Sequence, residues 1–237
     1  MIGYNYYTGI DASEAAEYIN RAIFTQLYSI YEGSKKSNHI LVLDLDETIV
    51  HCEYGIKRDA FAVFHLLEDN IFKAVSLYLR PHLHKFLKVM KKCFSEIVLY
   101  TSSVKSYADT VMNYVDPGKK YFSRRFYRDS LVTINGEYKK DLRRVSHDLS
   151  RVILVDDSPS LMFQKENCCK VIPFHGNLFD SNLIYLSIFL QKIANYIDIR
   201  IGIGFLLKCI QDNNLLAFFL YAKVLDEKEK FSYLVNI

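Results

Sequence analysis

Three short apolar segments that each end in polar or acidic residues constrain the fold of this chain most. They are HILVLDLD at 39–46, SEIVLYTSS at 95–103 and RVILVDDSPS at 151–160. Apolar runs of this length are typical of buried strands in a parallel sheet. Helical spacing lies between them, at 81–93 and 104–115. The pattern therefore predicts an α/β fold, with a Rossmann-like parallel sheet and helices on both faces.

Two stretches between these segments are predicted to form β-hairpins, and the first is an insertion after the acidic end of the first strand. Residues 60–80 are apolar on both sides of Glu-Asp-Asn at 68–70, a sequence that favours a turn. Residues 124–142 contain Asn-Gly at 135–136, a dipeptide typical of tight hairpin turns. A further short strand is expected at 169–174.

Both ends of the chain carry additional helical spacing, at 13–31 and 183–197 and in two apolar segments within 198–237. We therefore expect an N-terminal helix and linker at 1–38, an α/β domain at 39–197 and a helical extension at 198–237. No apolar run approaches the roughly 18 residues that a membrane-spanning helix needs, so no transmembrane segment is expected.

Composition limits the compartment and the partners. The net charge is only +3, which gives no basic field for nucleic acid, although the runs at 119–128 and 139–144 are basic. The five cysteines show no C-x-x-C spacing, and the N-terminus is polar and acidic, unlike a signal peptide. We expect reduced thiols and a nuclear or cytoplasmic location.

Acidic residues gather where the first and third apolar segments end. Asp44 and Asp46 share a face if the strand continues, and Asp156 and Asp157 end another strand. Because ligands of such sheets bind beyond the carboxyl ends of the strands, we expect these acids to converge there. Carboxylates gathered at one point need a cation, and oxygen ligands favour Mg²⁺ over zinc. The alternative is that they lie on unconnected surface loops.

Seven motifs follow one another along residues 39–194: DLDETIVH, LRPHLHKFL, LYTSSVKSYADTV, FYRDSLV, GEYKKDLRRV, ILVDDSPS and PFHGN. In this order they resemble the haloacid-dehalogenase superfamily, in the branch of RNA polymerase II C-terminal-domain phosphatases and their small relatives. The resemblance implies a Mg²⁺-dependent protein serine/threonine phosphatase that forms an aspartyl phosphate. It also implies an extended phosphopeptide substrate, such as phosphoserine in the polymerase tail.

The resemblance assigns catalytic roles to four residues. Asp44 aligns with the nucleophile that attacks phosphorus, and Asp46 aligns with the general acid and base. Thr101 matches a hydroxyl that hydrogen-bonds the phosphoryl oxygens; otherwise it is simply a threonine at a strand end. Lys140 matches the lysine that neutralises the phosphoryl group. Lys139 is the alternative, but the K-D-L spacing of the family favours Lys140; the other reading of either is a solvated lysine.

The resemblance also implies a metal site and a substrate groove. Asp157 would ligate the metal together with the carboxylate of Asp44 and the backbone carbonyl of Asp46. Asp156 would lie beside them and orient water or Lys140. Small members of the branch often carry Asn where this chain has Asp157, so the subfamily stays open.

The hairpin at 60–80, together with Val104 and Tyr107, would wall the groove, and Arg128 would lie near the phosphopeptide. The alternative is that Val104 and Tyr107 are core residues and that Arg128 is a surface charge. Three other functions remain to be weighed: a catalytically weak phosphoprotein-binding module, a receiver-type signalling domain and a small-metabolite phosphatase. The order of the acids argues against a receiver domain, and no segment resembles the capping domain of a metabolite phosphatase.

Overall fold

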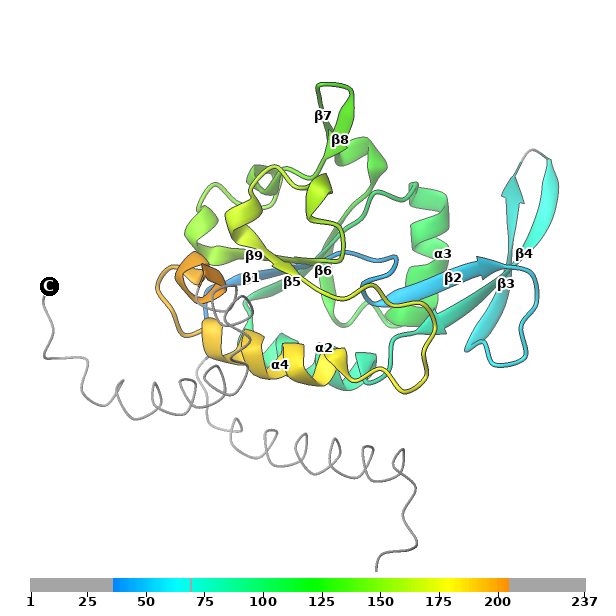
Figure 1. Ribbon diagram of the computed structural model, residues 1–237, viewed down its shortest axis with the longest axis horizontal. Helices are drawn as coiled ribbons and strands as arrows, with labels where there is room; N and C mark the ends of the chain where they lie inside the picture. The colour runs from blue at the N-terminus through cyan, green and yellow to red at the C-terminus, as the bar shows by residue number, and fades with distance from the viewer. Residues whose placement is uncertain (1–35, 69, 205–237) are drawn as a thin grey trace, which may run out of the picture.

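The computed structural model describes residues 36–68 and 70–204, and its centre is a five-stranded sheet (Figure 1). Every neighbouring pair in this sheet is parallel, as expected for apolar strands joined by helical crossovers. The prediction of an α/β fold with a parallel sheet is confirmed. In spatial order the strands are β10 (Cys168–Lys170), β9 (Val152–Asp156), β1 (Ile40–Leu43), β5 (Glu96–Tyr100) and β6 (Phe122–Phe126).

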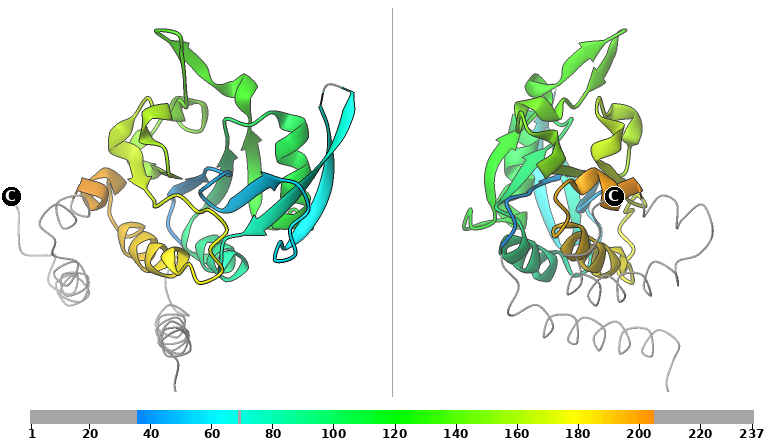
Figure 2. Two further views of the ribbon diagram at one scale, coloured as in Figure 1. Left: turned by 45° about the vertical axis from the view of Figure 1, so that its right-hand side comes forward. Right: turned by 90° about the vertical axis from the view of Figure 1, so that its left-hand side faces the viewer.

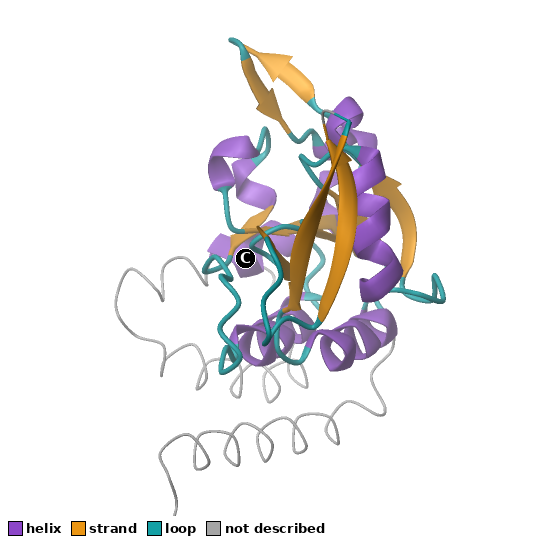
Figure 3. Ribbon diagram, turned by 90° about the vertical axis from the view of Figure 1, so that its right-hand side faces the viewer, coloured by secondary structure: helices purple, strands orange, loops and turns teal. Residues whose placement is uncertain are grey.

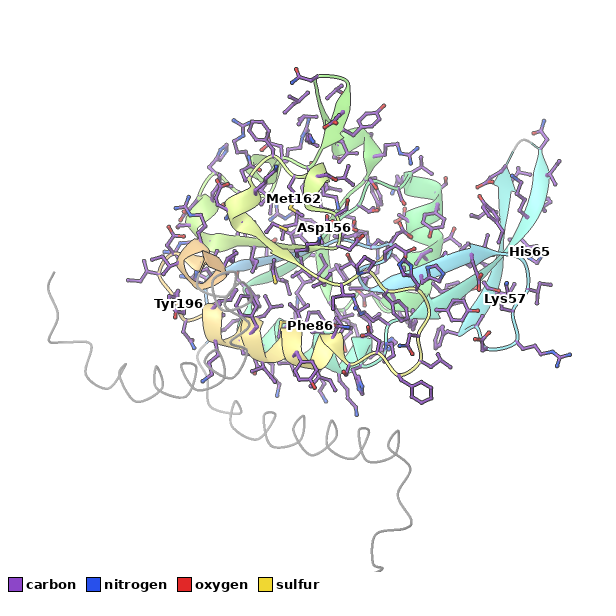
Figure 4. All side chains as sticks on the ribbon, in the orientation of Figure 1. Lys57, His65, Phe86, Asp156, Met162 and Tyr196 are labelled. Atoms are coloured by element: carbon purple, nitrogen blue, oxygen red, sulfur yellow. The ribbon has the colours of Figure 1, made fainter. Side chains whose placement is uncertain are left out.

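Both faces of the sheet are covered, because successive side chains of each strand point to opposite sides. Leu41 and Leu43 pack with the α-helices in the larger core cluster, whereas Val42 belongs to the second cluster. Phe86 of the first cluster and Met162 of the second lie on opposite sides of the sheet (Figure 4). The α-helices of the first cluster are α2 (Leu83–Cys93), α3 (Lys105–Val115) and α4 (Asn182–Ile193).

In the part of the chain that the structure describes, the second face is covered by short 3₁₀ helices and loops between β6 and β10, and α2, α3 and α4 lie on the other face (Figure 3). Helices on both faces are therefore confirmed, with shorter ones on this side. These 3₁₀ helices are Leu142–Arg144, Leu149–Arg151, Pro159–Leu161 and Lys165–Asn167.

The predicted hairpin insertion is present and forms a second, antiparallel sheet. Its strands, in the order β2 (Val50–Tyr54), β4 (Ile71–Leu79) and β3 (Ala62–Glu68), extend beyond the main sheet (Figure 2). Asn70 has the left-handed φ of 62° that a tight turn needs. β2 was not anticipated, because its sequence VHCEY has too little apolar alternation.

The prediction of one hairpin over 124–142 is wrong in its first part. Residues 122–126 form β6, the edge strand of the main sheet, which pairs with β5. Charged side chains are tolerated there because only one side of an edge strand is paired; Arg124 binds Glu96 and Arg125 binds Asp109. The hairpin itself is shorter, with β7 (Val132–Ile134) and β8 (Glu137–Lys139) joined at Asn135-Gly136.

The expected helix at 13–31 and most of the apolar tail at 198–237 lie outside the described residues. Within 36–68 and 70–204, helices are too short or too polar to cross a bilayer. The four described cysteines are free thiols.

The turn after β1, the end of β4 and the loop after β10 are joined by one buried side chain, Arg80. Its guanidinium donates hydrogen bonds to the carbonyls of Thr48 and Ile172, each at 2.9 Å. It also forms two hydrogen bonds of 3.0 Å with the carboxylate of Asp180. Planar two-point pairing of this kind fixes the orientation of both groups, so the three segments are held in register.

Candidate active site

The carboxyl ends of the central strands lie at one edge of the sheet because the strands are in register. Leu43 of β1 pairs with Val155 of β9, and the amide of Asp44 donates to the Val155 carbonyl at 3.0 Å. Asp44 and Thr101 directly follow β1 and β5, and Asp156 ends β9. Functional side chains far apart in sequence therefore emerge close together.

A fully buried lysine lies between two of these acids. Lys140 Nζ is 2.7 Å from Asp44 Oδ1 and 2.6 Å from Asp156 Oδ2. The neighbouring Lys139 points elsewhere and pairs with Glu137 on the short hairpin. Of the two lysines that the sequence left as candidates, only Lys140 contacts the acid cluster.

Asp157 is joined to this cluster by Thr48, a residue to which the sequence assigned no role. The Thr48 hydroxyl accepts a hydrogen bond from the Asp157 amide at 3.2 Å. The same oxygen lies 3.2 Å from Asp157 Oδ1 and 3.5 Å from Asp44 Oδ2, so its proton is shared between these acceptors. The D-x-D-x-T spacing was the available signal for this residue, but spacing alone could not show which carboxylates it contacts.

The expectation that all four carboxylates converge is not met by Asp46, whose side chain lies outside the cluster formed by the other three. Its carboxylate accepts hydrogen bonds from Tyr107 Oη at 2.5 Å and from Ser103 Oγ at 2.7 Å. The acid cluster of the described residues consists of Asp44, Asp156 and Asp157, whose ligand atoms lie within 4.8 Å of one another. Because β1 ends at residue 43, the two-residue strand repeat no longer places Asp46 on the same face as Asp44.

The environment of each acid shifts its affinity for protons. Burial raises the pKa of Asp46, and the hydrogen bonds from Tyr107 and Ser103 only partly oppose this rise. Burial also raises the pKa of Asp157, and the negative charge of Asp44 adds to it. A raised pKa favours the protonated form of Asp46 that a general acid needs.

The buried ion pair keeps Lys140 charged. Burial alone would lower its pKa, but the negative charges of Asp44 and Asp156 outweigh that effect and raise it. The pKa of Asp156 is itself raised, first by burial and then by the charge of Asp44. When all three carboxylates are ionised, they and the one lysine leave two uncompensated negative charges, which equals the charge of one divalent cation. The donor set is all oxygen, so a hard cation fits it.

Thr101 lies at the end of β5 and is buried. Its hydroxyl oxygen accepts a hydrogen bond from the amide of Ser103 at 3.0 Å, which fixes the loop that also presents Ser103 to Asp46. Thr101 therefore orders the entrance of the site in addition to any contact with a ligand.

A groove of about 380 Å³ adjoins Asp46, between the inserted sheet and the start of α3. Val104 is exposed rather than part of the core, and Arg128 donates to the carbonyl of Ser102 at 2.7 Å. Val104, Tyr107, Arg128 and the hairpin thus line one hollow. Its lining consists of Cys52, Glu53, Tyr54, Leu66, Glu68, Val75, Ser103, Val104, Tyr107 and Arg128.

A family model described as NLI interacting factor-like phosphatase matches residues 39–200. The chain belongs to this phosphatase family. The resemblance in the ordered motifs is therefore confirmed. The family match includes the two strand ends that carry the acids, those of β1 and β9, as well as Thr101 after β5 and the edge strand β6.

Several curated proteins are similar to this family member. CTD small phosphatase-like protein 3 of Caenorhabditis elegans is 36% identical over 156 residues, which are 65% of this chain and 54% of the relative. The human Carboxy-terminal domain RNA polymerase II polypeptide A small phosphatase 1 is 35% identical over 160 residues, with coverage of 67% and 60%. Nuclear envelope morphology protein 1 of Schizosaccharomyces pombe is 31% identical over 176 residues, with coverage of 73% and 37%. The matches span only part of each relative.

Two solved structures of the RNA polymerase II CTD phosphatase Fcp1, one of them from fission yeast, share the fold of this chain. The structure bound to beryllium fluoride has a TM-score of 0.51 and 25% identity, covering 64% of this chain and 45% of that one. Another Fcp1 structure also has a TM-score of 0.51, with 22% identity and coverage of 72% and 53%.

Proposed function

We propose that this chain is a Mg²⁺-dependent protein serine/threonine phosphatase that acts through an aspartyl phosphate. The observation that carries the proposal is the buried Lys140, held between Asp44 and Asp156 at the ends of β1 and β9. A cation at this position neutralises both the nucleophile and an incoming phosphoryl group. Phosphatases are also what the names of the similar human and worm proteins describe.

The residues divide the chemistry between two aspartates. Asp44 attacks phosphorus through a carboxylate oxygen, and the bond from phosphorus to the serine oxygen breaks. Asp46 gives its proton to that oxygen and then takes a proton from the water that attacks the aspartyl phosphate. Inorganic phosphate leaves, and both carboxyl groups return to their starting state. Lys140 and Thr101 stabilise the phosphoryl oxygens, each such donor being worth about 2.7–4 kcal/mol.

Mg²⁺ is the cation that we propose for the acid cluster. Asp44 and Asp157 would hold it, with the backbone carbonyl of Asp46. Both oxygens of Asp156 already accept hydrogen bonds, from Lys140 and from the Ser158 amide, so Asp156 serves to orient its neighbours. When bound, the ion supplies positive charge to the phosphoryl oxygens.

We propose that the groove beside Asp46 holds an extended phosphopeptide, such as phosphoserine segments of the RNA polymerase II tail. The apolar side chains of Leu66, Val75 and Val104 suit an apolar residue near the phosphoserine, and Arg128 supplies a positive charge at the edge. We place the activity in the 39–197 domain. We further propose a nuclear or cytoplasmic location, in keeping with relatives named for the polymerase tail and the nuclear envelope.

The test compares wild type with Asp44→Asn, using p-nitrophenyl phosphate and a phosphopeptide array. Wild type is expected to need Mg²⁺, to resist okadaic acid and to form a phosphoenzyme that hydroxylamine cleaves. Asp44→Asn is expected to lose turnover and phosphoenzyme together. Asp148→Asn, which changes an exposed aspartate that pairs with Arg151 and not with the acid cluster, is the control and should retain activity. Full activity of Asp44→Asn with the metal chelated would refute the proposal, and phosphopeptide binding without turnover in wild type would indicate a binding module.

A further inference from the structure

Glu47, His51 and His175 form a second cluster of metal-ligating side chains, and the proposed phosphatase chemistry uses none of them. Each offers one ligand atom, and these atoms lie within 4.8 Å of one another. His51 Nδ1 is 2.9 Å from Glu47 Oε1, and His175 Nδ1 is 2.8 Å from Glu47 Oε2. Two imidazoles from segments far apart in sequence thus meet at one carboxylate.

The backbone around these residues is held in an uncommon conformation. Glu47 has a φ of 57°, in the left-handed region that residues with side chains seldom adopt unless their surroundings enforce it. Its carbonyl accepts a 2.7 Å hydrogen bond from the amide of Phe174, the residue before His175. Gly176 follows at a φ of 79°, where an added Cβ would lie 3.6 Å from the His51 ring. The loop is therefore closely fitted to the turn that carries Glu47.

The buried Arg80 holds the same two segments together through hydrogen bonds to the Thr48 carbonyl, the Ile172 carbonyl and Asp180. Glu47 directly precedes Thr48, and His175 lies in the loop between Ile172 and Asp180, so two of the three ligands come from segments that this guanidinium holds. A site whose ligands come from segments already fixed loses little conformational entropy when it binds an ion.

The geometry fits a tetrahedral ion after a small expansion. Ligands about 2.0–2.1 Å from zinc in a tetrahedron are about 3.3 Å apart, so the present N–O separations of 2.8 and 2.9 Å would open by about 0.5 Å. The two rings are nearly perpendicular, at 87°, and the His175 side chain is 69% exposed. The His175 ring can therefore turn, and water can reach the fourth position.

We propose that Glu47, His51 and His175 bind a transition-metal dication, Zn²⁺ in the first instance, with water as the fourth ligand. Two imidazoles and one carboxylate form a donor set suited to zinc, whereas the all-oxygen set of Asp44, Asp156 and Asp157 suits a hard cation. The site is distinct from the acid cluster and does not depend on the proposed phosphatase function.

The experiment is a Zn²⁺ titration of the untagged, metal-free full chain by calorimetry, in excess Mg²⁺. Wild type is expected to bind one Zn²⁺ per chain and to melt at a higher temperature when zinc is bound. His175→Ala should weaken binding at least about tenfold, because it removes a ligand. His175 is largely exposed, so its loss leaves the core intact. His84→Ala, which removes an exposed histidine on α2, is the matched control and should bind zinc as wild type does.

A second readout uses Co²⁺, whose visible spectrum reports imidazole ligation and low coordination number. The spectrum of wild type should disappear in His175→Ala and persist in His84→Ala and Asp44→Asn. No zinc binding by wild type, or unchanged binding by His175→Ala, would overturn the proposal. Zinc binding that is lost in Asp44→Asn but kept in His175→Ala would place the ion at the acid cluster and would also overturn it. Phosphatase activity enters none of these measurements, so each proposal can fail alone.

Discussion

The hydroxyl of Tyr107 donates a 2.5 Å hydrogen bond to the carboxylate of Asp46, across 61 positions of sequence. The bond joins the first turn of α3 to the loop after β1, and it reaches the aspartate that we propose as the general acid. Ser103 donates to the other carboxylate oxygen at 2.7 Å. Both bonds stabilise the ionised form of Asp46 and so oppose the rise in its pKa that burial causes.

Replacing Tyr107 by Phe should therefore raise the pKa of Asp46 further. Asp46 must be protonated to release serine, so kcat/KM falls as the pH rises through its pKa. In Tyr107→Phe this alkaline limb should move to higher pH. The measurement is the pH profile of kcat/KM with a phosphoserine peptide, because a serine leaving group needs a proton more than nitrophenolate does.

Tyr114→Phe is the control for this profile, because Tyr114 stacks on Phe64 and has no contact with Asp46 among the described interactions. Its profile should match that of wild type. An alkaline limb that stays in place in Tyr107→Phe would show that Asp46 is not the group that titrates there.

Lys140→Met should destabilise the protein by about 3–5 kcal/mol at pH 7, because it leaves Asp44 and Asp156 buried without their cation. The pKa of Asp156 is already raised by burial and should rise further in the variant. When an acid has a higher pKa in the folded state than in the unfolded state, the folded state binds protons more tightly, and the free energy of unfolding rises as the pH falls. The loss of stability in Lys140→Met relative to wild type should therefore shrink as the pH falls towards about 5. Urea unfolding of wild type and Lys140→Met in EDTA, at several pH values, measures this difference in the free energy of unfolding.

Lys139→Met provides the comparison. Lys139 pairs with Glu137, which is exposed, and donates to the Ser160 carbonyl, so its loss should cost about 1 kcal/mol or less, with little dependence on pH. Equal costs for the two lysines would contradict the burial and pairing described for Lys140.

Val104→Glu should discriminate against peptide substrates. The new carboxylate would lie in the groove beside Asp46, where it would repel the negative charge of a phosphopeptide. Burying it against an apolar side chain of the peptide would also cost free energy, because the carboxylate would lose water. We expect kcat/KM for the phosphoserine peptide to fall at least about tenfold relative to that for p-nitrophenyl phosphate, or by about 1.4 kcal/mol. Ile197→Glu changes another exposed apolar residue outside the groove and should leave the ratio unchanged. A ratio unaltered by Val104→Glu would remove the groove from substrate recognition.

The main strands and the first hairpin were predictable because their signals are local. Apolar runs that end in polar or acidic residues predicted β1, β5 and β9, and the turn near Asn70 predicted the hairpin. β6 was missed because its stability comes from pairing with β5 and from ion pairs of Arg124 and Arg125, which no local pattern displays. Tertiary pairing overrides local propensity at such an edge.

The sequence predicted which residues belong to the candidate site better than it predicted how their side chains are arranged. The ordered motifs pointed to Asp44, Asp157 and Lys140, and the structure brings these residues together. The direction of the Asp46 carboxylate was not predictable, since it depends on where β1 ends and on donors from α3. The D-x-D-x-T spacing drew attention to Thr48 but could not show that its hydroxyl also contacts Asp157, more than a hundred residues away. His175 gave no signal as a ligand for the same reason, because its partner Glu47 is equally remote in the sequence.

The guanidinium of Arg80 has a consequence for how this corner of the molecule fluctuates. Opening of the turn at Thr48, of the strand end at Arg80 or of the loop at Ile172 and Asp180 would strip partners from one buried charge. We therefore expect these segments to open together, so that their slowly exchanging amides report similar free energies of opening in hydrogen exchange. A substitution in the loop after β10 can thereby impair turnover without touching any group that meets phosphorus.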